Sequence, residues 1–130
     1  ICRLGIIAII PLENFIKSSK NINGLAQAID AYGHIVYSSK IKCSSSPLQE
    51  LYKRHPKNDF LKYKIVRCLS GIHDEWTKSF LFEIIQTGCK GLKLEALRSL
   101  ILLEIEIPSN FQNDFSVEMQ KLESFLKKNC

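Results

Sequence analysis

Apolar residues recur at steps of three and four along most of the chain, a spacing that places them on one face of a helix. The pattern is clearest in residues 59–72, where Leu61, Ile65 and Leu69 follow one another at four-residue steps. In residues 92–107 apolar positions cover much of the girth, as in a helix packed between neighbours. A last apolar stripe predicts a helix over residues 117–128. The periodicity therefore predicts an all-α fold.

Two short phrases recur along the chain. The first consists of a small residue, a large apolar residue, usually a second small residue, any residue and an aliphatic residue. Its copies begin at Arg3, Ala31, Cys68 and Ser99, and the first departs from the pattern at Arg3 and the fourth at Ile101. The second opens with Pro-Leu, at Pro11 and at Pro47. Proline is tolerated in a first helical turn, where its missing N–H would be unpaired. We therefore predict helix starts at both prolines, with Ser46 as the N-cap of the second.

The remaining boundaries give pairs of helices. A further helix is predicted to start at Asp74, which can cap it, and to stop at Gly88. Residues 38–46 are mostly Ser and Lys, which predicts an exposed loop. Pro108 is expected to end the helix of residues 92–107. The expected organisation is one domain over residues 1–130, made of repeat units at about 1–20, 21–57, 58–89 and 90–130.

Two segments carry a more specific resemblance. Residues 65–72 (IVRCLSGI) and 96–100 (ALRSL) share an arginine in the same phase, at Arg67 and Arg98, followed by small and aliphatic residues. In this they resemble the HEAT-repeat family, particularly its short bacterial form. The resemblance implies a right-handed α-solenoid of three to four antiparallel helix pairs. It also implies a non-enzymatic scaffold for protein–protein interaction, with a partner on a concave surface lined by the second helices.

Composition agrees with a folded helical chain. Apolar residues make up 45% and charged residues 24%, whereas 6 Gly and 4 Pro supply few of the turns that an all-β fold needs. The apolar run of residues 1–10 is too short to span a bilayer and lacks a signal-peptide cleavage pattern. Because the chain starts at Ile1 within a unit, we expect a fragment of a longer protein. Leu4, Ile6, Ile7 and Ile9 would then lack a neighbour, which predicts self-association through this end.

The 5 cysteines are widely spaced and contain no C-x-x-C. This is neither a disulfide framework nor a zinc pattern, so a reducing, cytoplasmic setting is expected. Cys68 lies in an apolar run and is predicted to be a core thiol. Cys43, in the predicted loop, is the only plausible reactive thiol for a regulatory role.

No catalytic or metal-binding pattern emerges. The chain has neither a phosphate-binding loop nor H-E-x-x-H, and its 3 histidines are solitary. A Cys68–His73 nucleophilic pair and a metal site of His55, His73 and Asp74 are conceivable, but a core thiol and turn histidines fit the pattern better. We therefore predict no enzyme activity, no cofactor, no metal and no catalytic residue.

The net charge of +5 is densest between Lys53 and Arg67. A solvated helix face explains this better than an anion-binding patch. The alternative is a nucleic-acid-binding domain, since HEAT-like proteins include DNA glycosylases with a basic groove. Here that groove would comprise Lys53, Arg54, Lys57, Lys62, Lys64, Arg67 and Trp76.

The phrase alignment predicts where a protein partner would dock. It places Asn14, Glu50 and Phe80 in one series of exposed positions on successive helices, and Lys17, Lys53 and Glu83 in another. Acidic groups of the partner would meet the two lysines. Tyr52 would add an aromatic contact. The predicted partner-binding residues are Lys17, Tyr52, Lys53, Arg54 and Trp76, although such lysines can also serve only to keep a face solvated.

Overall fold

The computed structural model describes residues 2–40 and 42–107, and all regular secondary structure in this part of the chain is helical. The elements are α1 (Cys2–Ser18), α2 (Ile22–Ser39), α3 (Ser46–Arg54), α4 (Asp59–Cys68), the 3₁₀ turn η1 (Leu69–Gly71), α5 (Glu75–Thr87) and α6 (Lys90–Leu102). The all-α prediction is confirmed for these residues. The helix predicted over residues 117–128 lies outside them.

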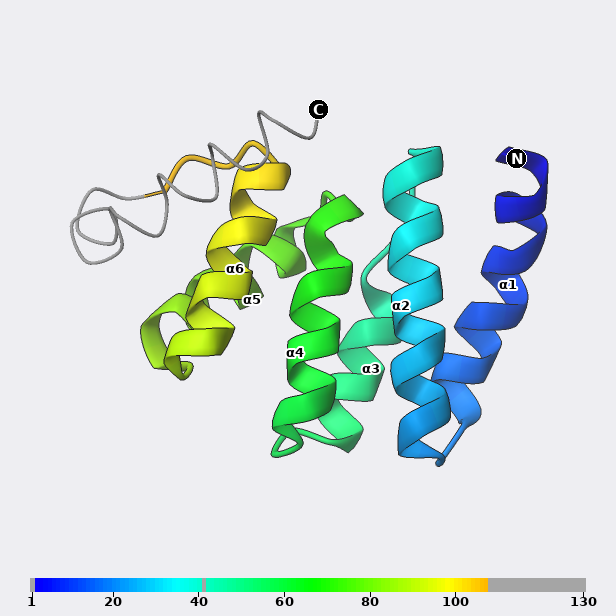
Figure 1. Ribbon diagram of the computed structural model, residues 1–130, viewed down its shortest axis with the longest axis horizontal. Helices are drawn as coiled ribbons and strands as arrows, with labels where there is room; N and C mark the ends of the chain where they lie inside the picture. Colours follow the sequence, from blue (N-terminus) through cyan, green and yellow to red (C-terminus); the bar gives the residue numbers. More distant parts are fainter. Residues whose placement is uncertain (1, 41, 108–130) are drawn as a thin grey trace.

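The helices form two layers. In Figure 1, α1, α2, α4 and α6 stand side by side, with α3 and α5 behind them. The contacts agree, because α2 packs between α1 and α4, α4 packs between α2 and α6, α3 contacts α1 and α4, and α5 packs on α6. The predicted unit boundaries after residues 20, 57 and 89 all fall in connections between helices.

Asparagine and aspartate caps start three of the helices. The side chains of Asn21, Asn58 and Asp74 accept hydrogen bonds from the third residue of α2, α4 and α5 respectively. The predicted start at Asp74 and stop at Gly88 are both confirmed. The cap of α3 is Ser45 rather than the predicted Ser46. Ser45 is fully buried, and its hydroxyl accepts a hydrogen bond from the side-chain amide of Gln49 at 2.8 Å.

The predicted helix start at Pro11 is wrong. Helix α1 runs without interruption from Cys2 to Ser18, with Pro11 exposed in its interior. The proline costs the Ile7 carbonyl its amide donor, a penalty of about 3 kcal/mol in a helix. Ile9 and Ile16, on either side, are both buried in the core, and this packing outweighs the penalty. The first unit therefore contains one helix rather than a pair.

Helix α6 also departs from the prediction, because it ends at Leu102 rather than continuing to 107. Glu104 adopts a left-handed backbone conformation, with φ of 60°. The amides of Glu104 and Ile105 bond back to the carbonyls of Ile101 and Leu100. These two bonds and the left-handed residue make a Schellman motif, which usually has glycine where Glu104 stands. Without that glycine the sequence carried no stop signal.

The first recurring phrase marks the core. Tyr32, Leu69 and Leu100 hold its second position, and all three are fully buried. Its small residues let helices approach closely: a Cβ added to Gly33 would lie 3.1 Å from both the Cα and the Sγ of Cys68. Cys68 is buried, which confirms its prediction as a core thiol.

Candidate functional site

The C-terminal turns of α1 and α3 are held together by Arg54. Its guanidinium donates to the Ile16 carbonyl and, at 3.5 Å, to the Ser19 carbonyl. These carbonyls lie at the C-terminus of α1, where backbone acceptors lack helical donors and a cation is favourable. Arg54, predicted to bind a partner, therefore positions two helix ends.

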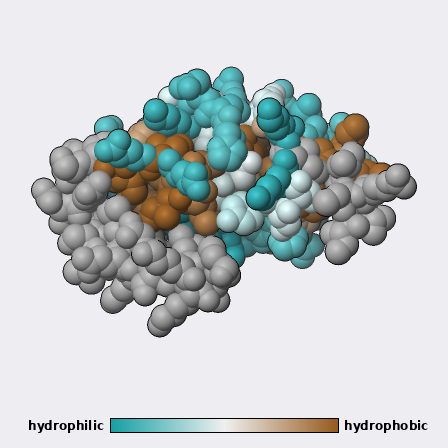
Figure 2. Space-filling model, turned by 90° about the horizontal axis from the view of Figure 1, so that it is seen from above, coloured by the Kyte–Doolittle hydropathy of each residue, from teal (hydrophilic) through white to brown (hydrophobic). Residues whose placement is uncertain are grey.

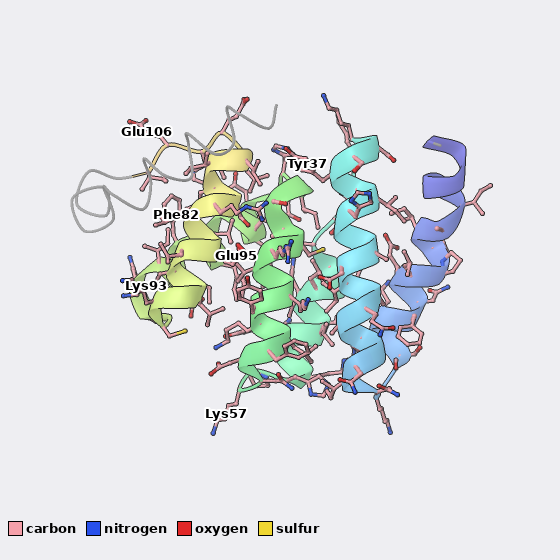
Figure 3. The ribbon with its side chains drawn as sticks, viewed as in Figure 1. Tyr37, Lys57, Phe82, Lys93, Glu95 and Glu106 are labelled. Carbon is pink, nitrogen blue, oxygen red and sulfur yellow. The ribbon has the colours of Figure 1, made fainter. Side chains whose placement is uncertain are left out.

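This contact brings together cations that are distant in the sequence. The connections α1–α2 and α3–α4 both lie at the lower end of the molecule in Figure 1, and Lys57 projects away from the helices there (Figure 3). Segments 17–20 and 53–59 together contain five Lys or Arg residues and one carboxylate, Asp59. We call the five exposed cations the basic end: Lys17, Lys20, Lys53, Arg54 and Lys57.

The sequence prediction found only part of the basic end. Lys17 and Lys53 are exposed, as the proposed docking surface requires. Lys20 was missed and Lys57 was considered only for nucleic acid, because nothing local signals that the α1–α2 and α3–α4 connections meet. The residue that could have indicated this meeting is Arg54, a cation in the last turn of a short helix. Its acceptors, however, are 35 and 38 residues away in the sequence.

The predicted aromatic contacts lie in a packed cluster. Trp76 stacks on Phe80, with ring centroids 4.6 Å apart, and Tyr52 meets Phe80 edge-on at 4.9 Å. The ammonium of Lys62 lies 5.8 Å from the centre of the Tyr52 ring. Tyr52 and Trp76 are half-buried. This cluster joins α3 to α5, so much of each aromatic surface is already used for packing.

The series of Asn14, Glu50 and Phe80 is wrong, because Phe80 is only 3% exposed. The Ser45 amide donates to Asp74 Oδ2, so the two N-caps, 29 residues apart, lie side by side. The phrase alignment used an offset of 30 residues between Glu50 and Phe80. An error of one residue turns a helix position by about 100°, which moves an outward position into the core.

Two lysines of the predicted nucleic-acid groove are engaged within the protein. The Lys64 ammonium lies 2.7 Å from Asp30 Oδ2, which ties α4 to α2. Lys62 lies 4.0 Å from Asp59 Oδ1 as well as over Tyr52. Arg67 is exposed. The cations between Lys53 and Arg67 therefore do not act as one patch.

The buried thiols are unsuited to nucleophilic chemistry. Burial raises the pKa of Cys68, which removes the thiolate that a Cys68–His73 pair would need. Burial also raises the pKa of Cys43, although its hydrogen bond with Tyr32 acts in the opposite direction. Cys43 is half-buried, so the prediction of an exposed reactive thiol there is wrong. Among Cys43, Cys68 and Cys89, the exposed thiol is that of Cys89. A cytoplasmic setting stays a prediction.

A buried polar contact beside Cys43 joins α1 to α2. The Tyr32 hydroxyl donates to Glu13 Oε1 at 3.0 Å, and burial, followed by contacts with Cys43 and Glu13, raises the pKa of Tyr32. This hydrogen bond gives the Tyr32 phenol a structural role between the two helices.

Two features are absent from residues 2–40 and 42–107: a cluster of metal ligands and a helix able to cross a membrane. No three His, Cys, Asp or Glu side chains in these segments gather closely enough to hold a metal ion. Nor is any helix there both long and apolar enough to cross a bilayer.

Comparison with known proteins adds no relative: no family model, no curated protein and no solved structure matches this chain.

Proposed function

We propose that this chain is a non-enzymatic scaffold that binds an acidic segment of a partner protein at the basic end. In this proposal the two helical layers form a right-handed α-solenoid of the HEAT type, in which successive helices pack as antiparallel pairs. The lateral contacts of α2 with α1 and α4, and of α4 with α6, support such stacking. So does the close contact of Gly33 with Cys68, which joins two copies of the recurring phrase.

The basic end carries the proposal. It gathers five exposed cations and one carboxylate, in a chain whose whole net charge is +5. Like charges gathered at one end of the molecule repel one another, and an acidic ligand relieves that repulsion. Arg54 fixes the geometry, because it ties the α1 end that bears Lys17 to the α3 end that bears Lys53.

A protein partner fits better than a nucleic acid. Two lysines of the supposed groove, Lys62 and Lys64, are paired with carboxylates, and Trp76 is stacked on Phe80. A continuous track of cations with free aromatic faces, as single-stranded nucleic acids require, is therefore not supported.

One observation keeps nucleic acid as the second candidate. Phe60, in the first turn of α4 beside Asp59, is 50% exposed, and the Lys64 ammonium lies 5.7 Å from its ring centre. An exposed ring near the basic end offers a stacking surface for a base.

The test compares two polyanions of equal charge, a flexible Glu-rich peptide and a single-stranded oligonucleotide, by fluorescence anisotropy at several salt concentrations. The peptide is expected to bind more tightly. Lys17→Glu with Lys53→Glu should weaken its binding about tenfold or more, because two attractions become repulsions. The matched control is Lys42→Glu with Lys78→Glu, which makes the same charge change at two exposed lysines outside the basic end.

Tighter binding of the oligonucleotide, with affinity falling steeply as salt rises, would support the nucleic-acid candidate instead. Equal losses in the two double variants would show that net charge rather than the basic end determines binding. Binding of neither polyanion at low salt would overturn both candidates.

A further inference from the structure

Helix α1 has an outward face whose residues are exposed. It lies at the edge of the row of helices in Figure 1, and its neighbours are α2 and α3. Ile9 and Ile16 point into the core, whereas Ile7 and Ile10 are 70% and 65% exposed. Figure 2 shows hydrophobic surface at this edge of the molecule.

The outward face is uncharged along three turns, and its N-terminal part is apolar. At helical spacing it comprises Ile7, Ile10, Pro11, Asn14, Phe15 and Ser18, all exposed. A surface helix that contacts only solvent normally carries charged residues on its outer face. Exposed branched side chains in a row are typical of a surface that a partner covers.

The charges that border this face select the kind of partner. Lys17, in the last turn of α1, and Lys20, just beyond it, mark the C-terminal end of the face. Arg54 holds α3 against the same turn, which adds Lys53 nearby. The face is thus an apolar stripe with cations at one end.

A second copy of the chain fits these charges poorly. Two α1 helices packed in parallel would place Lys17 beside its own counterpart. Packed antiparallel, Lys17 would meet the first turn of the other α1, which contains no acidic residue. Neither arrangement gives Lys17 an acidic partner, so the exposed isoleucines do not by themselves favour the predicted self-association.

We infer that the outward face of α1 binds an amphipathic helix of a partner protein, with acidic residues at the end that lies beside Lys17 and Lys20. The apolar side of this helix, with its own residues at steps of three and four, covers Ile7, Ile10 and Pro11. The inference rests on the proposed function and specifies the secondary structure of the acidic segment and where it docks.

The probes are two synthetic amphipathic peptides of about 20 residues with the same Leu face, one with three Glu in its first turn and the other with Gln at those positions. Binding to the full chain is measured by fluorescence anisotropy. The Glu peptide is expected to bind about fivefold more tightly at low salt, with the difference shrinking at high salt.

Substitutions then locate the interface. Ile7→Ser with Ile10→Ser is expected to weaken binding of the Glu peptide about tenfold or more, because two apolar contacts that the bound peptide would cover are lost. Tyr37→Ser is the matched control, since Tyr37 is 47% exposed on α2, at the end of the molecule opposite Lys57 (Figure 3). Circular dichroism checks that each variant is folded.

Equal losses in the isoleucine variant and in the Tyr37 control would overturn the inference, as would equal affinity for the Glu and Gln peptides. Concentration-dependent self-association that the isoleucine substitutions abolish, without peptide binding, would assign the face to a second copy. If the flexible Glu-rich peptide still binds through Lys17 and Lys53 in these cases, only the inference about α1 fails and the proposed function stands.

Discussion

Arg54 shows how a residue can be assigned correctly to a surface while the contacts that it makes within the chain go unpredicted. Its sequence context, next to Lys53 and in the last turn of a helix, is the same for a partner-binding cation and for a helix-capping one. The guanidinium is planar and carries several donors in a fixed geometry, which suits it to bridging two carbonyls better than the compact ammonium of a lysine. Its partners, the carbonyls of Ile16 and Ser19, become visible only in the folded chain.

Replacing this cap should destabilise the protein more than removing its neighbour. Arg54→Ala is expected to lower the free energy of unfolding by about 1–2 kcal/mol, because the hydrogen bonds from a charged donor to the end of α1 are lost. Lys53→Ala removes an exposed charge and should change it by less than about 0.5 kcal/mol. Urea unfolding of both variants measures the difference, and equal effects would contradict the capping role.

At the scale of elements, what could be predicted depended on the range of the interaction. The starts of α2, α4 and α5 depend on caps that act within three residues, and Asp74 was identified from sequence. The helix start expected at Pro11 is wrong, because the burial of Ile9 and Ile16 against other helices outweighs the cost of a proline within a helix. The end of α6 at Glu104 was missed because its left-handed conformation is held by surrounding structure rather than by a glycine.

The candidate site followed the same division. The exposure of Lys17 and Lys53 follows from helical periodicity, which is local. Lys20 and Lys57 lie in two connections between helices. These connections come together through contacts between α1 and α3, which no short sequence pattern encodes. Phe80 was misplaced because a one-residue error in aligning two degenerate phrases exchanges the buried and exposed sides of a helix.

Close packing of α2 on α4 gives a test at two glycines. Gly33→Ala is expected to lower the free energy of unfolding by about 1–2 kcal/mol, because the new Cβ would lie 3.1 Å from the Cα of Cys68 and the helices would have to separate. Gly91→Ala has nothing within 4 Å and should instead stabilise α6, by up to about 1 kcal/mol. Thermal or urea unfolding measures both, and the same sign for the two would refute the close-approach explanation.

At the scale of the whole molecule, the two-layer arrangement restricts which helices share contacts. Helix α6 packs against α4 and α5, whereas α1 packs against α2 and α3. One core nevertheless extends from Ile9 to Ile107. In a stacked array stability is close to a sum of local and nearest-neighbour contributions, whereas a single compact core loses stability throughout.

Truncating a buried leucine distinguishes these two behaviours. Leu100→Ala is expected to lower the free energy of unfolding by about 2–5 kcal/mol, because Leu100 is fully buried and a cavity is left behind. If the helices form an array, hydrogen exchange should accelerate strongly in α4, α5 and α6 and much less in α1. Leu69→Ala, at the equivalent position of the phrase, should cost a similar amount but also affect α2, because η1 contacts α2, α4 and α6. A uniform acceleration in all helices would contradict the solenoid, and a cost below about 1 kcal/mol for both leucines would contradict the equivalence of the two copies.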